Sequence, residues 1–312
     1  MILVTGATGF VGTALVARLR ADGRRVRPTS RRSLAGYVPV GMLDAMTDWS
    51  VPLEGVDAVV HLAARVHVMR DDARDPLAAF RATNVDATIH LAKQAAQRGV
   101  RRFVFVSSVK VNGETTFGEA AFNAEDKPAP VDPYGVSKRE AEEALLELAR
   151  ETGMEVTIIR PPLVYGPGVG GNFKSMLEWL QRGVPLPLGA VRNKRTLVAL
   201  DNLIDLVVIC IDHPAAANQV FLVGDPEDLS TPELLRRLAR AMDVPIRLIP
   251  IPVSLLRLGA ALFGKRAVAQ RLCGSLRVDT AKTRNLLGWT PPVPVDEGLR
   301  KVAAHFMEQR RQ

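Results

Sequence analysis

Cysteine is scarce in this chain, which has only Cys210 and Cys273 among its 312 residues. Each lies in an apolar stretch with a helical pattern, as is typical of small core residues. The pattern argues against a disulfide framework and against a metal site. We therefore expect no bound metal and a reducing compartment.

Aromatic residues make up only 5% of the chain, and no block of Lys or Arg is interleaved with them. A formal net charge of +8 would suit nucleic acid, but the cations are scattered and often stand beside acids, as in Lys138-Arg139-Glu140. We therefore expect no nucleic-acid partner. The excess positive charge suits anionic small molecules and solubility.

A long hydrophobic run is also missing. The longest one near the C-terminus, residues 249–263, contains Arg257 and two prolines and is too short to span a bilayer. The N-terminus begins as a strand with no basic leader, so we expect no signal peptide. The sequence predicts a cytoplasmic protein without membrane insertion.

What the chain does have is 47% hydrophobic residues and a glycine-rich start, MILVTGATGFVG. Residues 2–5 are predicted to form a buried strand, and the apolar residues after the glycines repeat with helical period. In the G-x-x-G-x-x-G spacing, Gly6 permits the turn, Gly9 lets the backbone approach a pyrophosphate, and Gly12 lets helix and strand pack closely. The helix N-terminus then faces the anion. A plain turn is the alternative, but the pattern favours a dinucleotide-binding corner, with contacts at Gly6, Gly9, Phe10, Val11 and Gly12.

The second strand is predicted over residues 24–28, before Ser30, Arg31 and Arg32. An acidic residue here would hydrogen-bond the ribose of NAD, whereas an arginine can pair with the 2′-phosphate of NADP. This chain has no acid at the position and offers hydroxyl and guanidinium donors. The pattern favours NADP(H) without excluding NAD(H), and a solvated basic loop is the structural alternative.

Two more strands are predicted before residue 65. Residues 38–43 form one, and Asp44 after it is a candidate acceptor for the adenine amino group, unless Met42 takes that place. Residues 56–64 form the other, in which His61 is expected to be a hydrogen-bonded core residue. The small side chains at the carboxyl end of this strand leave room for the cofactor, with expected contacts at Leu62, Ala63 and Ala64.

The polar stretch 65–75 lacks periodicity and is predicted to be a loop beyond the carboxyl end of a strand, where ligands bind in open α/β sheets. Its candidate substrate contacts are His67, Met69 and Arg70. A long helix containing Asn84 is predicted over 76–98, followed by a buried strand over 101–107.

The next motifs carry acid–base chemistry. Tyr134 and Lys138 lie one helical turn apart in a stretch that Pro133 opens. A free phenol titrates near 10, and a cation about 4 Å away at an effective dielectric of about 20 lowers that pKa by about 3 units before desolvation. We therefore expect Lys138, with oxidised nicotinamide, to lower the pKa of Tyr134, and a hydroxyl from the Ser107-Ser108 strand end to orient a substrate oxygen.

Together these motifs resemble the extended branch of the short-chain dehydrogenase/reductase superfamily, also called the NAD-dependent epimerase/dehydratase family. The resemblance covers nearly the whole chain. It rests on TGATGFVG (5–12), HLAA (61–64), NV (84–85), SSVKVNG (107–113), YGVSK (134–138), RPPLVYGPG (160–168), RTLVALDN (195–202) and LGWTP (287–291).

The resemblance implies roles for individual residues. Ser108 would be the active-site hydroxyl, Tyr134 the acid/base, and Lys138 the residue that holds the ribose and lowers the phenol's pKa. Asn84 would support the cofactor and active-site network, and the loop that begins at Pro161 would pass near nicotinamide. The substrate of such enzymes is usually a nucleotide diphosphate sugar, and a homodimer is common.

Two departures from the family's usual motif narrow the choice of reaction. A sugar 4,6-dehydratase would carry Asp-Glu after the active-site hydroxyl, where this chain has Val109 and Lys110. Asn112 stands where many members have Tyr. The motif SSVKVNG, with the ARVHVM loop, looks like that of bacterial 4-keto-sugar reductases of surface-polysaccharide pathways. Lys110 is either a surface residue or a substrate contact.

Substrate contacts are also expected in the second half, at Asn172, Arg195 and Arg271, with Arg277 a weaker candidate for a phosphate. A guanidinium fork suits a diphosphate, although Arg195 could also be an exposed residue at a strand start. These residues complete the predicted substrate site.

The sequence thus predicts an α/β protein with a Rossmann-type, doubly wound parallel sheet and a smaller C-terminal substrate-binding lobe. Residues 1–170, with parts of 195–225 returning, would bind the dinucleotide, and residues 171–312 mainly the substrate. The favoured activity is NAD(P)H-dependent reduction of a 4-keto nucleotide sugar. A UDP-hexose 4-epimerase with tightly bound NAD is the alternative, and a non-catalytic NADP-sensing protein is the third possibility.

Overall fold

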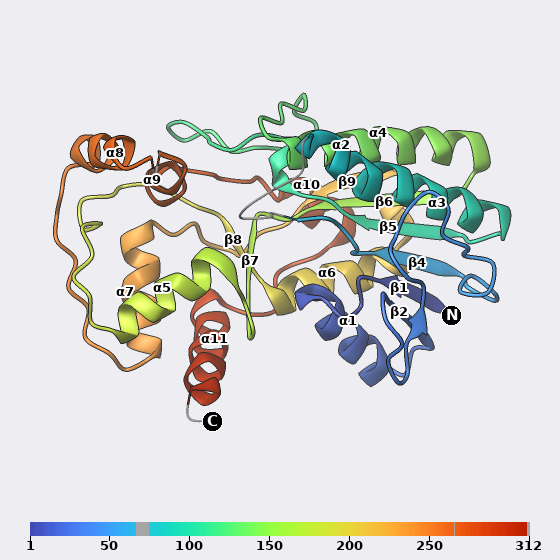
Figure 1. The fold of residues 1–312 in the computed structure, drawn as a ribbon, viewed down its shortest axis with the longest axis horizontal. Helices are drawn as coiled ribbons and strands as arrows, with labels where there is room; N and C mark the ends of the chain where they lie inside the picture. Colours follow the sequence, from blue (N-terminus) through green and yellow to red (C-terminus); the bar gives the residue numbers. More distant parts are fainter. Residues whose placement is uncertain (67–74, 265, 311–312) are drawn as a thin grey trace.

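A parallel sheet forms the centre of the larger part of the molecule (Figure 1). The computed structural model describes residues 1–66, 75–264 and 266–310. The strand order is β3-β2-β1-β4-β5-β6-β9, and every pair in it is parallel. The strands are β1 (Ile2–Thr5), β2 (Val26–Ser30), β3 (Val38–Pro39), β4 (Ala58–His61), β5 (Arg102–Val106), β6 (Glu155–Arg160) and β9 (Gln219–Leu222).

Helices cover both faces of this sheet. Alternate residues of β1 face opposite sides, so that Val4 packs with α1 (Phe10–Ala21) and α6 (Leu200–Asp212), whereas Leu3 packs with α3 (Ala87–Gln97) and α4 (Pro133–Thr152). Figure 1 shows these two helix layers above and below the strands. The predicted doubly wound Rossmann-type fold is confirmed. The strand order reverses between β1 and β4, which is where such sheets bind dinucleotides.

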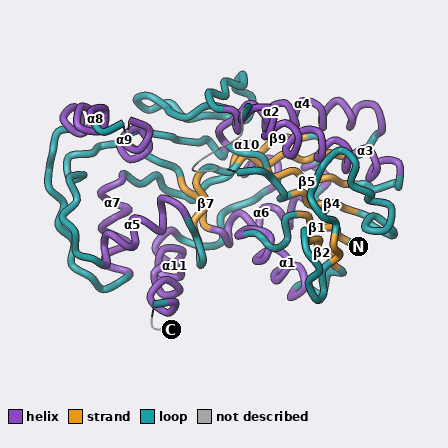
Figure 2. The backbone as a smooth tube through the Cα atoms, viewed as in Figure 1, coloured by secondary structure: helices purple, strands orange, loops and turns teal. Residues whose placement is uncertain are grey.

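The smaller lobe is built from helices and long loops (Figure 2). A two-stranded sheet, β7 (Leu163–Tyr165) with β8 (Leu197–Ala199), lies at its border with the main sheet. Helices α5 (Gly171–Gln181), α7 (Thr231–Ala241) and α11 (Val295–Gln309) share one apolar cluster. The remaining helices of the second half are α8 (Val253–Leu262), α9 (Arg266–Cys273) and α10 (Ala281–Leu287).

Four predicted elements differ from the observed ones by more than one residue at an end, and one of them is the strand predicted over 56–64, which covers only Ala58–His61. The second strand begins at Val26 rather than at residue 24, because the turn at Gly23, with φ of 70°, delays it. The third strand covers Val38–Pro39 rather than 38–43, because Gly41 turns the chain with a φ of 67°. The helix predicted over 76–98 is interrupted.

That interruption has a clear local form. Helix α2 (Pro76–Arg81) leads into a π-helical turn, Ala82–Asp86, before α3 begins. A single extra residue in the hydrogen-bonding pattern rotates the rest of the helix about its axis, and such π-bulges often occur at functional sites. Here the turn contains Asn84.

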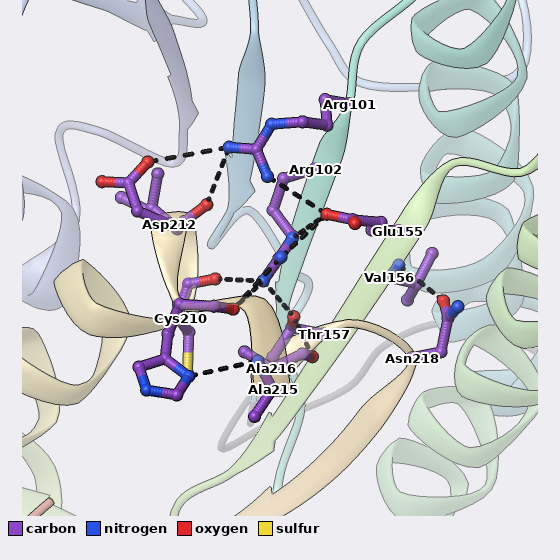
Figure 3. A network of polar contacts seen from close by, with 12 residues as sticks. Arg101, Arg102, Glu155, Val156, Thr157, Cys210, Asp212, Ala215, Ala216 and Asn218 are labelled. Carbon is purple, nitrogen blue, oxygen red and sulfur yellow. Dashed lines mark hydrogen bonds and ion pairs between the residues drawn. The ribbon is translucent and has the colours of Figure 1, made fainter. Parts of the chain in front are cut away.

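A buried guanidinium at the start of β5 ties the sheet to α6 (Figure 3). The Arg102 side chain is 0% exposed and donates to the carbonyl oxygens of Cys210 (2.7 Å) and His213 (3.2 Å), and to Glu155 (2.9 Å). The last carbonyls of a helix lack partners within it, and a cation there is favourable. Arg102 therefore holds β5, β6 and the end of α6 together.

We predict that Arg102→Met lowers the free energy of unfolding by about 3 kcal/mol, because it leaves buried carbonyls unpaired. Urea titration at pH 7 measures the change. Arg101→Met is the matched control, since the Arg101 side chain is 50% exposed and its ion pairs with Glu155 and Asp212 should contribute less than about 1 kcal/mol. Equal losses in the two variants would contradict the role assigned to Arg102.

Candidate active site

The glycine corner joins β1, α1 and the end of β4 in close backbone contact. A Cβ on Gly6, whose φ is 65°, would lie 2.7 Å from the Ala63 nitrogen, and one on Gly12 would lie 2.1 Å from the Gly6 oxygen. The Gly9 amide donates to the Gly6 carbonyl at 2.9 Å. No side chain caps α1 at Gly9, so the first-turn amides and the positive helix end are left for an anion. The corner therefore fits a pyrophosphate.

The end of β2 carries the residues predicted to read the cofactor's ribose. Ser30 is buried and donates a hydrogen bond to the Arg32 carbonyl, while Arg31 and Arg32 are exposed. Asp44 lies in a turn, where its carboxylate accepts from the Met46 amide at 2.8 Å. The arginines are thus accessible to a ligand, whereas the Asp44 carboxylate is engaged by its own turn.

His61 is a core residue, as expected. Its Nδ1 lies 2.7 Å from the Thr5 hydroxyl and its Nε2 lies 3.0 Å from that of Thr88. Burial lowers its pKa to about 3, with a smaller contribution from Lys138, so the imidazole is neutral. The strand end after it, Leu62 to Ala64, is half-buried beside the glycine corner.

Asn84 connects that strand end to α4. From the π-helical turn, its Nδ2 donates to the Arg65 carbonyl (3.1 Å) and to the Ser137 hydroxyl (3.0 Å), and its Oδ1 accepts from the Arg65 amide (2.8 Å). The side chain is buried. Asn84 therefore positions the backbone on both sides of the expected cofactor path.

Tyr134 lies in the first turn of α4, where Ser108 reaches it. Asp132 caps the helix by accepting from the Gly135 amide at 2.6 Å, and Pro133 suits the first turn. Burial raises the pKa of Tyr134, a hydrogen bond with Ser108 lowers it, and the Asp132 charge raises it again. The phenol and the Ser108 hydroxyl thus meet as predicted.

Lys138 lies one turn further along and is almost fully buried. Its ammonium donates to the Val106 carbonyl at 2.9 Å and lies 4.1 Å from the centre of the Phe105 ring. Burial lowers its pKa to about 7, against a smaller opposite effect of Glu142. In this structure Lys138 is not among the groups that shift the pKa of Tyr134, so the expected lowering of the phenol's pKa is not met here; burial is the larger effect.

A buried ion pair anchors the middle of α4. The Glu142 carboxylate accepts from Arg160 on β6, with nitrogen–oxygen distances of 2.5–3.1 Å, and both side chains are 5% exposed or less. Arg160 also donates to the Asn112 side chain at 3.1 Å. The pair therefore joins α4 to the sheet and to the loop after Ser108. No motif in the sequence marked Glu142 or Arg160 for this role.

Lys110 pairs with its neighbours. Its ammonium donates to Asp132, the cap of α4, and to Glu114 at 3.2 Å. The sequence left open a surface residue or a substrate contact; the side chain is instead only 22% exposed and its charge is already paired, which favours a structural role at the start of α4.

The residues expected to hold the substrate come from both halves of the chain. Arg195 donates to the carbonyls of Arg271 (3.0 Å) and Gly274 (3.1 Å), and burial lowers its pKa. Arg271 on α9 and Asn172 at the start of α5 are exposed. Arg277 is paired with Asp228 at 2.7 Å and with Glu119, which leaves it a weaker candidate. His67, Met69 and Arg70 lie outside the described residues.

Ser107 belongs to the SSVKVNG motif, but the sequence assigned it no role of its own. Its hydroxyl is buried at the end of β5 and has no hydrogen-bond partner among the described residues. A buried hydroxyl without a partner is costly unless a ligand or water completes it. Its position beside Val106 and Ser108 suits a cofactor contact. In the described parts of the chain, no cluster of His, Cys, Asp or Glu has the composition of a metal site.

Comparison with known proteins agrees with this geometry. A model of the NAD dependent epimerase/dehydratase family matches residues 2–224. The UDP-glucose 4-epimerase of Vibrio cholerae is 47% identical over 98% of this chain and 95% of its own length. The UDP-glucose 4-epimerase of Mycolicibacterium smegmatis is 31% identical over 97% of each chain. A short-chain dehydrogenase/reductase superfamily protein from Agrobacterium tumefaciens, solved with bound NAD, superposes with a TM-score of 0.77 at 25% identity over the whole of both chains.

We predict that Lys138→Met stabilises nucleotide-free protein more at neutral than at alkaline pH. Because the folded-state pKa is about 7 and the unfolded one is about 10.5, the unfolded chain binds more protons between these values, and Lys138 opposes folding most at pH 7 and below. The stability gain of the variant over the wild type should shrink by roughly 2–3 kcal/mol from pH 7 to 9.5 in urea titrations. A gain that does not change with pH would show that Lys138 is not held in this environment.

A second prediction concerns the basic end of β2. If Arg31 and Arg32 bind a 2′-phosphate, the double variant Arg31→Ala/Arg32→Ala should weaken NADPH binding at least tenfold more than NADH binding, because only NADPH carries that group. Calorimetric titration with both cofactors measures the difference. Equal weakening would show that these arginines form a solvated basic loop.

Proposed function

This chain belongs to the NAD-dependent epimerase/dehydratase family, and from that membership we propose that it is a UDP-hexose 4-epimerase with a retained NAD cofactor. The observation that carries the proposal is the 47% identity to a UDP-glucose 4-epimerase over nearly the full length of both chains. Membership makes the protein an NAD-dependent enzyme of the nucleotide-sugar class. The epimerase activity itself is the proposal.

The sequence motifs alone favour a 4-keto-sugar reductase and leave the 4-epimerase as the alternative. The relatives reverse that preference, because the two 4-epimerases described above, from Vibrio cholerae and Mycolicibacterium smegmatis, are each more than 30% identical to this chain. The 25%-identical GDP-6-deoxy-D-mannose reductase of Pseudomonas aeruginosa keeps a reductase as the second candidate. A non-catalytic sensor does not need the contact between Ser108 and Tyr134, which this chain retains.

The residues present fit a dinucleotide. The glycine corner excludes side chains where a pyrophosphate would lie, the unpartnered Ser107 hydroxyl is at the end of β5, and Lys138 is buried two strands away from the corner. NAD⁺ held there would supply the hydride acceptor and donor that inversion at C4 of the sugar requires. Gly6, Gly9, Gly12, Asn84 and Lys138 are the residues we propose hold it.

The chain's own residues would handle the proton and the substrate. Tyr134 accepts the proton of the 4-hydroxyl group and later gives it back, while Ser108 hydrogen-bonds the same oxygen. Because burial raises its pKa, Tyr134 needs nearby positive charge to act as a base. Lys138 does not shift this pKa in the structure, so we propose that a bound oxidised cofactor supplies the charge. Arg195, Arg271 and Asn172 are the proposed contacts of the nucleotide diphosphate.

Three finer expectations remain predictions. They are a homodimer, a cytoplasmic location and a role in surface-polysaccharide synthesis. Within the described ranges, the helices are too short or too polar to cross a membrane.

Two measurements test the proposal: the amount of NAD⁺ that the purified protein releases, and the turnover of the Tyr134→Phe variant. Freshly purified wild-type protein should release about one NAD⁺ per chain on denaturation and convert UDP-glucose to UDP-galactose. The variant should release the same amount of NAD⁺, while turnover falls by at least 10³-fold, because the 4-hydroxyl proton has no acceptor. Coupled assay and chromatography of the released nucleotide measure both.

Tyr37→Phe is the matched control, because it removes the same atom from a tyrosine packed at the edge of the α1 cluster. It should retain turnover within about twofold of the wild type. Protein that releases no cofactor and consumes NADPH only with a 4-keto sugar would overturn the epimerase proposal in favour of the reductase. Unchanged turnover in Tyr134→Phe would remove this residue from the mechanism.

A further inference from the structure

Helix α8 is apolar on two sides. On one side, Val253 and Leu256 pack against the apolar cluster of the smaller lobe. On the other, Leu255, Leu258 and Leu262 follow the spacing of one helical face and are 57%, 59% and 78% exposed. Helix α8 contributes no buried residue to the described structure. Contiguous exposed apolar surface usually marks a contact with another molecule or with a membrane, so the outer face of α8 needs an apolar partner.

The exposed apolar surface continues beyond the helix. Phe263, directly after α8, is 80% exposed, and Ile249 before it is 45% exposed. Figure 1 shows α8 at the end of the smaller lobe that lies away from the central sheet. The apolar residues thus form one protruding edge.

The charge around this edge has one sign. From Val244 to Val278 the chain has six cationic residues and no acidic one. Arg257 on α8 and Arg266 at the start of α9 are exposed, and neither joins an ion pair within the described ranges. Both arginines also line a cavity with residues 115–118, beside the apolar edge. A partner that covers the edge therefore meets apolar surface with positive charge next to it.

An anionic bilayer offers both features: apolar acyl chains in its interior and negatively charged headgroups at its surface. Leucine and phenylalanine side chains enter the boundary between headgroups and acyl chains, and arginine side chains extend to the phosphates. A second copy of this chain fits less well, because a twofold interface would bring the same cations face to face. Each cation near an anionic membrane surface adds to the attraction, which salt screens.

We propose that Leu255, Leu258, Leu262 and Phe263, with Arg257 and Arg266, form a membrane-docking surface for anionic lipid bilayers. Helix α8 would lie in the plane of the interface, which requires no spanning helix. The same lobe carries Arg195 and Arg271, so docking would place the proposed substrate site close to the membrane surface. The proposal does not depend on the epimerase activity.

Flotation with lipid vesicles tests it on the full-length protein. Wild-type protein should bind vesicles of 30% phosphatidylglycerol in phosphatidylcholine at least tenfold more strongly than vesicles of phosphatidylcholine alone. Raising NaCl from 0.1 to 0.5 M should release most of it. Leu258→Glu/Leu262→Glu should weaken binding to the anionic vesicles at least tenfold, and Arg257→Ala/Arg266→Ala should weaken it to the level seen with phosphatidylcholine.

The matched control is Met46→Glu/Val51→Glu, which adds the same two charges at exposed apolar residues of the other lobe, 87% and 68% exposed. It should bind vesicles within about threefold of the wild type. Turnover of dissolved UDP-glucose should be the same in the wild type and in Leu258→Glu/Leu262→Glu, since the substituted side chains point to solvent. This readout separates failure of docking from failure of the epimerase proposal.

Three results would overturn the proposal. One is the absence of vesicle binding by the wild type, and another is equal binding to anionic and zwitterionic vesicles. The third is a dimer in sedimentation velocity that Leu258→Glu/Leu262→Glu converts to monomer, because a second copy would then cover the face. Equal weakening by the control variant would contradict it as well, since any added negative charge would then explain the effect.

Discussion

The buried pair of Glu142 and Arg160 is the constraint on which the proposed chemistry depends. Helix α4 carries both Tyr134 and Lys138, and this pair fixes the helix to β6 while Arg160 also holds Asn112 in the loop after Ser108. Two charges are stable at this depth only because each satisfies the other's hydrogen bonds. The phenol, the ammonium and the serine hydroxyl thus come from one connected unit, and their relative positions are set by it.

A second constraint, steric rather than electrostatic, places the cofactor next to that unit. The backbone of Gly6 and Gly12 leaves no room for a Cβ, so β1, α1 and the end of β4 meet at the point where the strand order reverses. Asn84 links this corner to α4 through Arg65 and Ser137. The proposed cofactor site and the acid–base groups therefore lie at the carboxyl ends of the strands, while Arg102 stabilises the opposite ends.

Local patterns made part of this predictable from the sequence. The glycine spacing predicted the close backbone contact at the corner, and the Tyr134–Lys138 spacing with the Ser108 strand end picked out candidate acid–base residues, of which Ser108 and Tyr134 meet in the structure. The π-helical turn at Asn84 was not predictable, because 76–98 has a continuous helical pattern. The pKa of Tyr134 was predicted in the wrong direction for this structure, because burial, which depends on tertiary packing, is the largest effect on it and Lys138 is not among the groups that shift it. Glu142 and Arg160 are far apart in the sequence and belong to no motif that marks them as partners.

The central claim is that C4 of a UDP-hexose loses and regains its hydride within one site of this protein. Incubation of the enzyme with UDP-glucose deuterated at C4, in ordinary water and without added cofactor, tests it most directly. The account predicts UDP-galactose that keeps the deuterium at C4, as measured by NMR and mass spectrometry. Product that has lost the deuterium to solvent, or no inversion at C4, would contradict it.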